Sequence, residues 1–225
     1  MFIGHFAAGM AGKKIESAIS LGTLFLAAQF LDLLWPTLLL LNLEQVMIAP
    51  GISKVTPLDF VHYPISHSLV AVFGWGLLFG MVYFLATRNQ RGAWLLGCLV
   101  VSHWVLDLIV HIPDLPLYPG DSPKVGLGLW NSTVLTVLVE GMIFITGILL
   151  YVKSKKAVSK KISWWFWSLV LFLLFIQVMN FAGPPPPNIE AIAWAGQLQW
   201  IFVIWGWWAD KKSWQKSLFL LTPIR

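Results

Sequence analysis

The sequence predicts an all-α polytopic membrane bundle, with about six transmembrane helices and a short N-terminal helix. The first observation is composition: 58% of the 225 residues are hydrophobic and only 11% are charged, whereas soluble domains carry about 25% charged residues. The second is a mean hydropathy of +0.76. The third is a series of apolar runs close to the roughly 20 residues that cross a bilayer. These observations indicate a multi-pass membrane protein whose surroundings are lipid.

The chain begins with an apolar segment, residues 1–12, that is too short to span a membrane. Lys13 and Lys14 follow it and would stand at the membrane surface, so we expect a re-entrant helix that carries His5 inward. The alternative is an interfacial helix with His5 in water. The next apolar run, from Ile19 to Leu43, is longer than the roughly 7–15 residues of a cleavable signal core. It is therefore the first predicted span.

Six spans follow from the apolar runs, at about residues 18–42, 65–87, 92–112, 130–152, 163–182 and 190–209. Of the 15 Lys and Arg residues, only Lys54 and Lys124 fall on one side of this arrangement. The positive-inside rule then places both termini in the cytoplasm, in an inner (plasma) membrane. The 43–64 and 113–129 segments would face outward. Because the basic residues flank spans, their excess does not indicate nucleic-acid binding.

The basic stretch from Lys153 to Lys161 divides the chain into two parts. Residues 1–152 form a four-span core that contains all five histidines, and residues 153–225 form a supporting helix pair. No internal repeat is evident, so a duplicated transporter architecture is not indicated. The single cysteine, Cys98, excludes an internal disulfide and a Cys-rich zinc site.

Ionisable residues inside the predicted spans are the main functional signal. His103, Asp107 and His111 follow one another at four-residue spacing, about 40° apart around a helix, and so share one face. Buried ionisable groups in a bilayer cost several kcal/mol unless they are paired or coordinated. His111 lies near the membrane surface and could instead be hydrated, so it is a secondary candidate.

Further acids and histidines fall at a similar depth in other predicted spans. Asp32 lies in the first span, His67 at the outer end of the second, and Glu140 inside the fourth. A single buried histidine could bond a backbone carbonyl, but several acids and histidines at one level need a shared countercharge. A divalent cation would supply it. The outer-loop acids Asp59, Asp114 and Asp121 are more often solvated, and of these Asp59 is kept as a secondary candidate.

Imidazole and carboxylate ligands without thiolate suit zinc first, and also manganese, iron or nickel. Such an ion would lower the pKa of bound water to about 7 and produce hydroxide. This chemistry would hydrolyse an ester, amide or phosphoester without a serine or cysteine nucleophile.

Several short motifs resemble those of the YdjM-like inner-membrane proteins, which are widely described as metal-dependent hydrolases. The string His62-Tyr-Pro-Ile-Ser-His67-Ser-Leu is similar to their His-Arg-Gly-x-Thr-His-Ser-Leu segment. Ser102-His103-Trp-Val-Leu-Asp107 resembles their Ser-His-x-x-x-Asp segment, and Gly4-His5-Phe their opening histidine motif. Leu31-Asp32 stands where they usually carry Pro-Asp. The family is also distantly similar to zinc-dependent phospholipase C.

The resemblance covers roughly residues 1–112 and implies a specific ligand set. The implied metal ligands are His5, Asp32, His67, His103 and Asp107, with His62 as a ligand or substrate contact. Two departures bear on substrate and geometry. Tyr63-Pro64 replaces Arg-Gly and removes an arginine that could bind phosphate, and Leu31 replaces the proline before Asp32.

The leading hypothesis is an integral-membrane metal-dependent hydrolase acting on an amphiphilic substrate, with a lipid phosphoester as the best guess. Glu140 and His62 are its candidate catalytic residues, with Glu140 carrying the proton. A proton- or metal-coupled transporter could use the same histidines and aspartates. A non-catalytic membrane protein with a structural metal is the third reading. The oligomeric state is left open.

Overall fold

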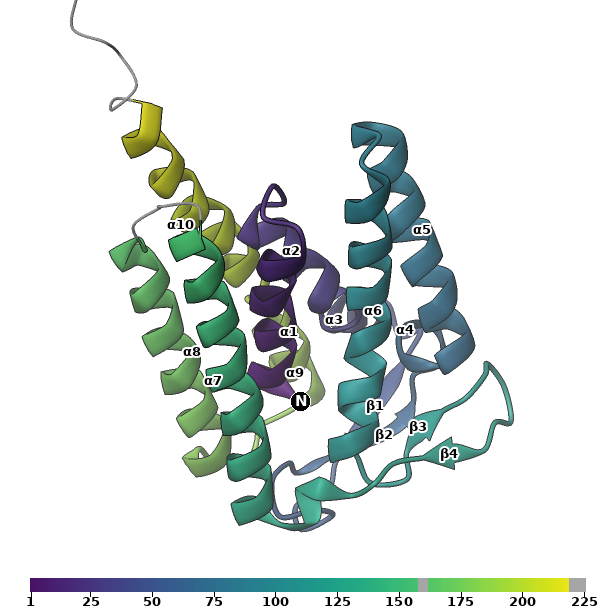
Figure 1. The fold of residues 1–225 in the computed structure, drawn as a ribbon. Coiled ribbons are helices and arrows are strands. Elements are labelled where there is room, and N and C mark those ends of the chain that lie inside the picture. The colour runs from purple at the N-terminus through teal and green to yellow at the C-terminus, as the bar shows by residue number, and fades with distance from the viewer. Residues whose placement is uncertain (158–161, 219–225) are drawn as a thin grey trace, which may run out of the picture.

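The computed structural model describes residues 1–157 and 162–218. Residues 158–161 of the predicted basic loop and the C-terminal Arg225 lie outside that range. The described chain is mostly helical, as predicted, and Figure 1 shows two helix groups flanking a central N-terminal helix. The helices are α1 (Phe2–Ile15), α2 (Leu21–Ala28), α3 (Phe30–Leu40), α4 (Pro64–His67), α5 (Leu69–Thr87), α6 (Gln90–Val110), the 3-10 turn η1 (Leu129–Asn131), α7 (Thr133–Ala157), α8 (Trp164–Ala182), α9 (Ile189–Gln197) and α10 (Trp200–Leu218).

Two small β-hairpins depart from the predicted all-α bundle. Strands β1 (Gln45–Ile48) and β2 (Leu58–His62) pair antiparallel, and so do β3 (Leu115–Pro116) and β4 (Lys124–Val125). Both hairpins lie in segments predicted as outer loops, at the end of the bundle where α6 ends (Figure 1). Strands β3 and β4 have two residues each, too few for the alternating pattern that reveals a strand in a sequence. The burial of the β2 side chains does not alternate.

Four described helices are long and apolar enough to cross a membrane: α5, α6, α7 and α8. The α2–α3 pair passes the same test as a unit but is bent by 56°, so it is a broken span or a re-entrant loop. The described chain therefore has four to five candidate spans rather than six. The predicted sixth span, 190–209, is divided between α9 and α10, and neither helix passes the test.

The break in the first predicted span falls at Gln29. Gln29 leaves the helical conformation between α2 and α3, whereas Pro36 lies inside α3 without ending it. Asp32 stands in the first turn of α3, directly after the break. The bend therefore sets the direction from which the Asp32 side chain approaches the interior.

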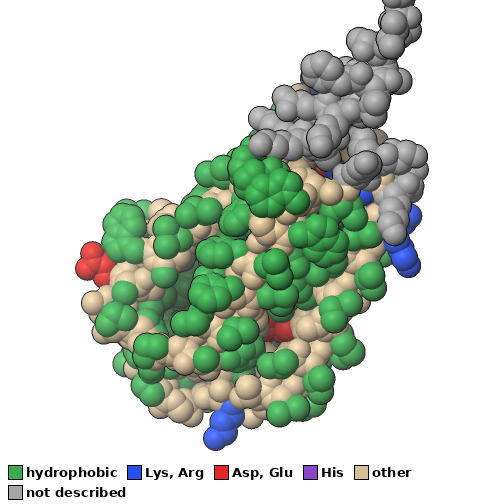
Figure 2. Space-filling view, turned by 90° about the vertical axis from the view of Figure 1, so that its left-hand side faces the viewer, with side chains coloured by type: hydrophobic (Ala, Val, Ile, Leu, Met, Phe, Trp, Pro, Cys, Tyr) green, Lys and Arg blue, Asp and Glu red, His purple; other side chains and the backbone are tan. Residues whose placement is uncertain are grey.

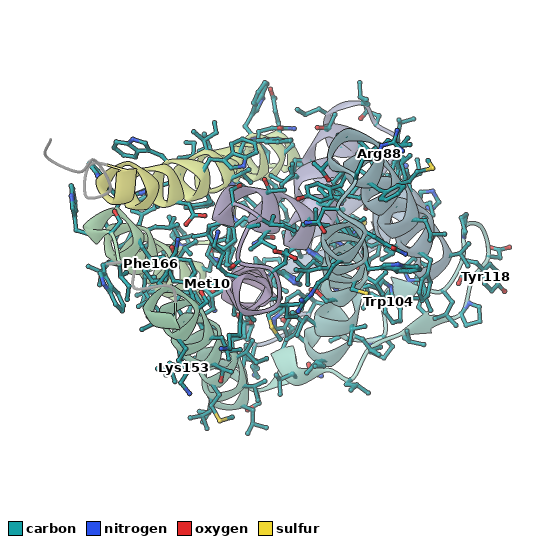
Figure 3. The ribbon with its side chains drawn as sticks, turned by 45° about the horizontal axis from the view of Figure 1, so that its top comes forward. Met10, Arg88, Trp104, Tyr118, Lys153 and Phe166 are labelled. Carbon is teal, nitrogen blue, oxygen red and sulfur yellow. The ribbon has the colours of Figure 1, made fainter. Side chains whose placement is uncertain are left out.

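Helix α1 occupies the middle of the molecule and packs against α7, α2 and α6. Figure 3 places Met10 of α1 among the surrounding helices, with Arg88, Tyr118 and Lys153 at the periphery. Ala7 of α1 touches α7 at Gly147, where an added Cβ would lie 2.6 Å from the Ala7 carbonyl oxygen. His5 is fully buried, which excludes the alternative of an interfacial helix with this side chain in water.

The outer faces of the bundle are apolar. Only 11% of the spanning window of α5 is buried inside the protein, and 22% of that of α7. Figure 2 shows hydrophobic side chains covering most of the face turned to the viewer, the left-hand side of Figure 1. Such a surface is stable only in contact with lipid or another apolar phase.

Candidate metal centre

Five predicted ligands converge although they come from four helices. His5 is on α1, Asp32 on α3, His67 at the end of α4, and His103 and Asp107 on α6. Their ligand atoms form two groups whose members lie within 4.8 Å of one another: His5, His103 and Asp107, and Asp32, His67 and His103. Both groups could hold a metal ion, and His103 belongs to both.

Four nitrogen–oxygen distances define the centre of this cluster. His103 Nε2 lies 3.2 Å from Asp107 Oδ2 and 3.5 Å from Asp32 Oδ1. His67 Nε2 lies 3.8 Å and 3.7 Å from the same two oxygens. Ligands about 2.0–2.1 Å from a tetrahedral zinc ion are separated by about 3.3 Å. The observed distances are close to that spacing.

The hydrogen bonds of His103 fix which ring nitrogen is free. Its Nδ1 lies 2.8 Å from the carbonyl oxygen of Ala28. Because a carbonyl oxygen can only accept, Nδ1 carries the proton, and Nε2 of the neutral ring has a lone pair. Although Asp107 Oδ2 is near, the buried Nε2 has no hydrogen-bond partner. An unpartnered nitrogen beside carboxylates suits a cation.

A chain of hydrogen bonds through Ser66 fixes the tautomer of His67 in the same way. Ser66 Oγ lies 2.5 Å from Glu44 Oε2 and 2.7 Å from His67 Nδ1. The Glu44 carboxylate can only accept, so the serine hydroxyl donates to it and accepts from His67 Nδ1–H. Glu44 also accepts bonds from the backbone N–H groups of Ile65 and Ser66, both at 2.8 Å. His67 Nε2 is thereby left as a lone-pair donor.

His5 approaches from the other side of His103. The two imidazole rings are stacked, with centroids 3.5 Å apart and an interplanar angle of 5°. His5 Nε2 lies 3.0 Å from Asp107 Oδ1, an oxygen that also accepts from the α-amino group of Met1 at 2.6 Å. His5 can therefore act as a ligand or hold Asp107 so that Oδ2 faces His67 and His103.

The cluster borders a cavity of about 620 Å³. Asp32, His67 and Asp107 line its polar part. Glu140, whose Oε2 accepts from Gln177 Nε2 at 3.2 Å, lines it as well. Much of the remaining wall is apolar and includes Phe2, Trp35, Phe60, Trp130, Phe181 and Ile192.

The other predicted candidates fall in different places. His62 is exposed on β2, opposite Gln45, and Asp59 is half-buried on the same strand, opposite Met47. Neither lines the cavity among the described residues. His111 does line it, although hydration near the membrane surface was the simpler expectation, and it is only 4% exposed.

Sequence reasoning did not identify Glu44 or Ser66. Ser66 could have been found from its position directly before His67. Glu44 lies 22 residues before Ser66, outside any motif, and no spacing rule connects the two.

The fold and this site define a helical membrane protein with a buried His/Asp cluster able to hold a metal ion. The chain belongs to the YdjM inner membrane protein family, whose model matches residues 1–183. The match confirms the family resemblance and extends it to the end of α8. No curated protein and no solved structure is similar enough to the chain to count as a match.

Proposed function

We propose that the protein is an integral-membrane, metal-dependent hydrolase that acts on an amphiphilic substrate, with a lipid phosphoester as the best candidate. Asp32, His67, His103 and Asp107 are the proposed ligands, with His5 as a further ligand or as the group that orients Asp107. A divalent ion held there, zinc first among the candidates, would polarise the substrate and activate water for attack.

One observation carries this proposal: two imidazoles, each anchored through Nδ1, direct Nε2 at two carboxylates in a buried space. Backbone and side-chain acceptors fix the protons of His103 and His67 on Nδ1. Imidazole Nε2 atoms and anionic oxygens 3.2–3.8 Å apart need a positive charge between them, which a proton on Nε2 or a metal ion can supply. Metal-binding histidines commonly have their second nitrogen anchored in this way.

Glu140 is the proposed proton acceptor for the attacking water. Its carboxyl group is 2% exposed and lines the same cavity as Asp32 and Asp107. Gln177 donates a hydrogen bond to Oε2 of this carboxylate, which would take the proton of the attacking water. The exposed position of His62 gives it no contact with this cavity, and its role as a substrate contact stays a prediction.

The cavity wall favours an amphiphilic substrate. Phe2, Trp35 and Phe60 line it together with the carboxylates. A polar headgroup would lie near the acids and histidines while an apolar chain contacts the aromatic wall.

Transport is less well supported, because apolar residues separate the His/Asp cluster from Lys13 at the other end of α1. Between His5 and Lys13, the buried residues of α1 are Phe6, Ala7, Gly9, Met10 and Gly12. Phe6 and Met10 are fully buried. An ion crossing the protein would have to pass this region, where no ionisable side chain of α1 could relay it.

The test is metal content and turnover of the detergent-purified protein. We expect at least one divalent ion per chain by mass spectrometry, and release of a water-soluble product from a panel of lipid phosphoesters. His103→Ala and Asp107→Ala should lose both, whereas Asp121→Asn, which changes an exposed acid, should keep both. Wild-type protein that purifies without metal, or that binds metal and turns over none of the panel, would contradict the proposal.

A further inference from the structure

His111 is held in a defined orientation at the end of α6. The imidazole centroid lies 4.2 Å from the Trp130 ring and 5.0 Å from the Phe60 ring. The side chain is 4% exposed and lines the 620 Å³ cavity. Two aromatic rings and the helix end thus restrict the imidazole to one position at the cavity wall.

Asp114 and Tyr63 complete the arrangement. His111 Nδ1 lies 2.8 Å from Asp114 Oδ1, and the Tyr63 hydroxyl donates to the same oxygen at 3.2 Å. Burial raises the pKa of Tyr63 well above its usual value, and the neighbouring Asp114 raises it further. Tyr63 therefore stays protonated and donates to the carboxylate. Asp114 must accept a hydrogen bond from Nδ1–H of His111, which leaves Nε2 for other partners.

The second ring nitrogen of His111 has no hydrogen-bond partner among the described residues. The same cavity is lined by Asp32, His67, Asp107 and Glu140. A substrate bound at the metal centre would therefore share its space with an imidazole whose other nitrogen is anchored by a carboxylate. A pairing of this kind orients a histidine and stabilises its positively charged form during proton transfer.

We propose that His111, positioned by Asp114 and Tyr63, donates the proton to the leaving oxygen of the substrate. This inference rests on the proposed hydrolase function. In the form that carries both ring protons, Nδ1–H donates to Asp114 and Nε2–H faces the cavity. The attacking water gives its proton to Glu140 as the new oxygen–phosphorus bond forms. The ester oxygen–phosphorus bond breaks with its electron pair on the leaving oxygen, which takes the Nε2 proton. Glu140 then releases its proton to water and His111 takes one from water, which restores both side chains.

The proposal also narrows the substrate class. A proton donor is needed only when the leaving oxygen is strongly basic, as in an aliphatic alcohol such as the glycerol of a lipid. Phenolic leaving groups depart as stable anions and need no such donor. His111 therefore indicates an alkyl ester whose leaving group is an aliphatic alcohol.

The test compares two substrates that share one phosphoryl group: the alkyl lipid ester that the wild type turns over, and the corresponding p-nitrophenyl ester. In His111→Gln, we expect kcat for the alkyl ester to fall about 10²–10⁴-fold, the usual contribution of a positioned acid. Turnover of the p-nitrophenyl ester should stay within about threefold of wild type. Asp114→Asn should show the same selective loss to a smaller extent, and Tyr118→Phe, an exposed tyrosine, should show neither.

Metal content, measured on the same preparations, separates a chemical role from a structural one. It should be equal in wild type and His111→Gln. Equal losses on both substrates, or a loss of metal, would show that His111 only supports the fold. Unchanged turnover of the alkyl ester would exclude the proton donor while leaving the hydrolase proposal intact. A wild type that hydrolyses neither substrate would remove the proposed function and this inference together.

Discussion

At the scale of single residues, the ability of the site to hold a cation depends on side chains that would not themselves touch it. His67 presents Nε2 to the cluster because Ser66 Oγ accepts a hydrogen bond from Nδ1–H. Ser66 can accept this bond because its own hydroxyl donates to Glu44. Trp104 adds a bond from its indole N–H to the His67 carbonyl oxygen at 2.9 Å. The imidazole is thereby fixed in both tautomer and direction.

Glu44→Gln tests this relay without changing side-chain size. The amide can donate to Ser66, which allows the hydroxyl to donate to His67 Nδ1 and shifts the ring proton to Nε2. We expect metal affinity to fall about 10–100-fold, the usual cost of removing such a partner. Competition with a chelator measures it. The exposed Glu190→Gln serves as control, and an unchanged affinity in Glu44→Gln would show that the relay does not set the tautomer.

At this scale the sequence predicted the residue types of the ligands, but not the residues that hold the ligands by hydrogen bonds. His103 and Asp107 share a helix face through their spacing, and polar residues at one depth in different spans were expected to meet. Glu44 escaped notice because it reaches Ser66 across the β1–β2 hairpin, and hairpin contacts of this kind leave no periodic pattern. His62 carries a motif resemblance, yet its side chain is exposed at the end of β2.

At the scale of elements, a buried charge cluster joins helices at the end of α1 away from the metal centre. Lys13 Nζ lies 2.5 Å from Asp210 Oδ2, and Lys155 forms an ion pair with the other oxygen. The backbone N–H of Leu21 also donates to Asp210, at 3.2 Å. The position of Lys13 after an apolar segment predicts a lysine at the membrane surface, but its side chain is 3% exposed and joins α1 to α10.

Asp210→Asn should therefore destabilise the protein by about 3–5 kcal/mol, because two buried lysines lose their common partner. Burial alone raises the pKa of this carboxyl, but Lys13 and Lys155 hold it below the usual 3.8. A depressed pKa means that the stabilisation is present at neutral pH and is lost as the pH falls below about 4. Thermal unfolding in detergent between pH 7 and pH 3 should show a smaller decline for Asp210→Asn than for wild type. Equal declines in stability for the two proteins would contradict the role of Asp210 in the pH dependence. Asp121→Asn is the control for the loss of an acidic side chain.

At the scale of the whole molecule, the broken first span and the central α1 explain how a metal centre can form. Continuous spans would present their polar residues on separate faces, whereas the bend at Gln29 and the entry of α1 bring Asp32 and His5 to α6. The lengths of the apolar runs correctly predicted the four helices α5 to α8. It could not predict the break or the division of residues 190–209, because both depend on packing between helices and not on local hydropathy. The division into a 1–152 core and a 153–225 support stays a prediction.

The predicted membrane orientation can be tested most directly on α6. Its 21 residues extend about 31 Å, roughly the thickness of a bilayer. Arg91 at its start and Asp121 in the β3–β4 connection are both exposed, and the positive-inside rule places them in the cytoplasm and outside, respectively.

In a Cys98→Ser background, an impermeant maleimide should label Asp121→Cys in intact spheroplasts and Arg91→Cys only after permeabilisation. The reverse pattern would invert the topology and place the cavity at the cytoplasmic face, where a lipid substrate would have to come from the inner leaflet. Equal labelling of both positions in intact spheroplasts would show that α6 does not cross the membrane.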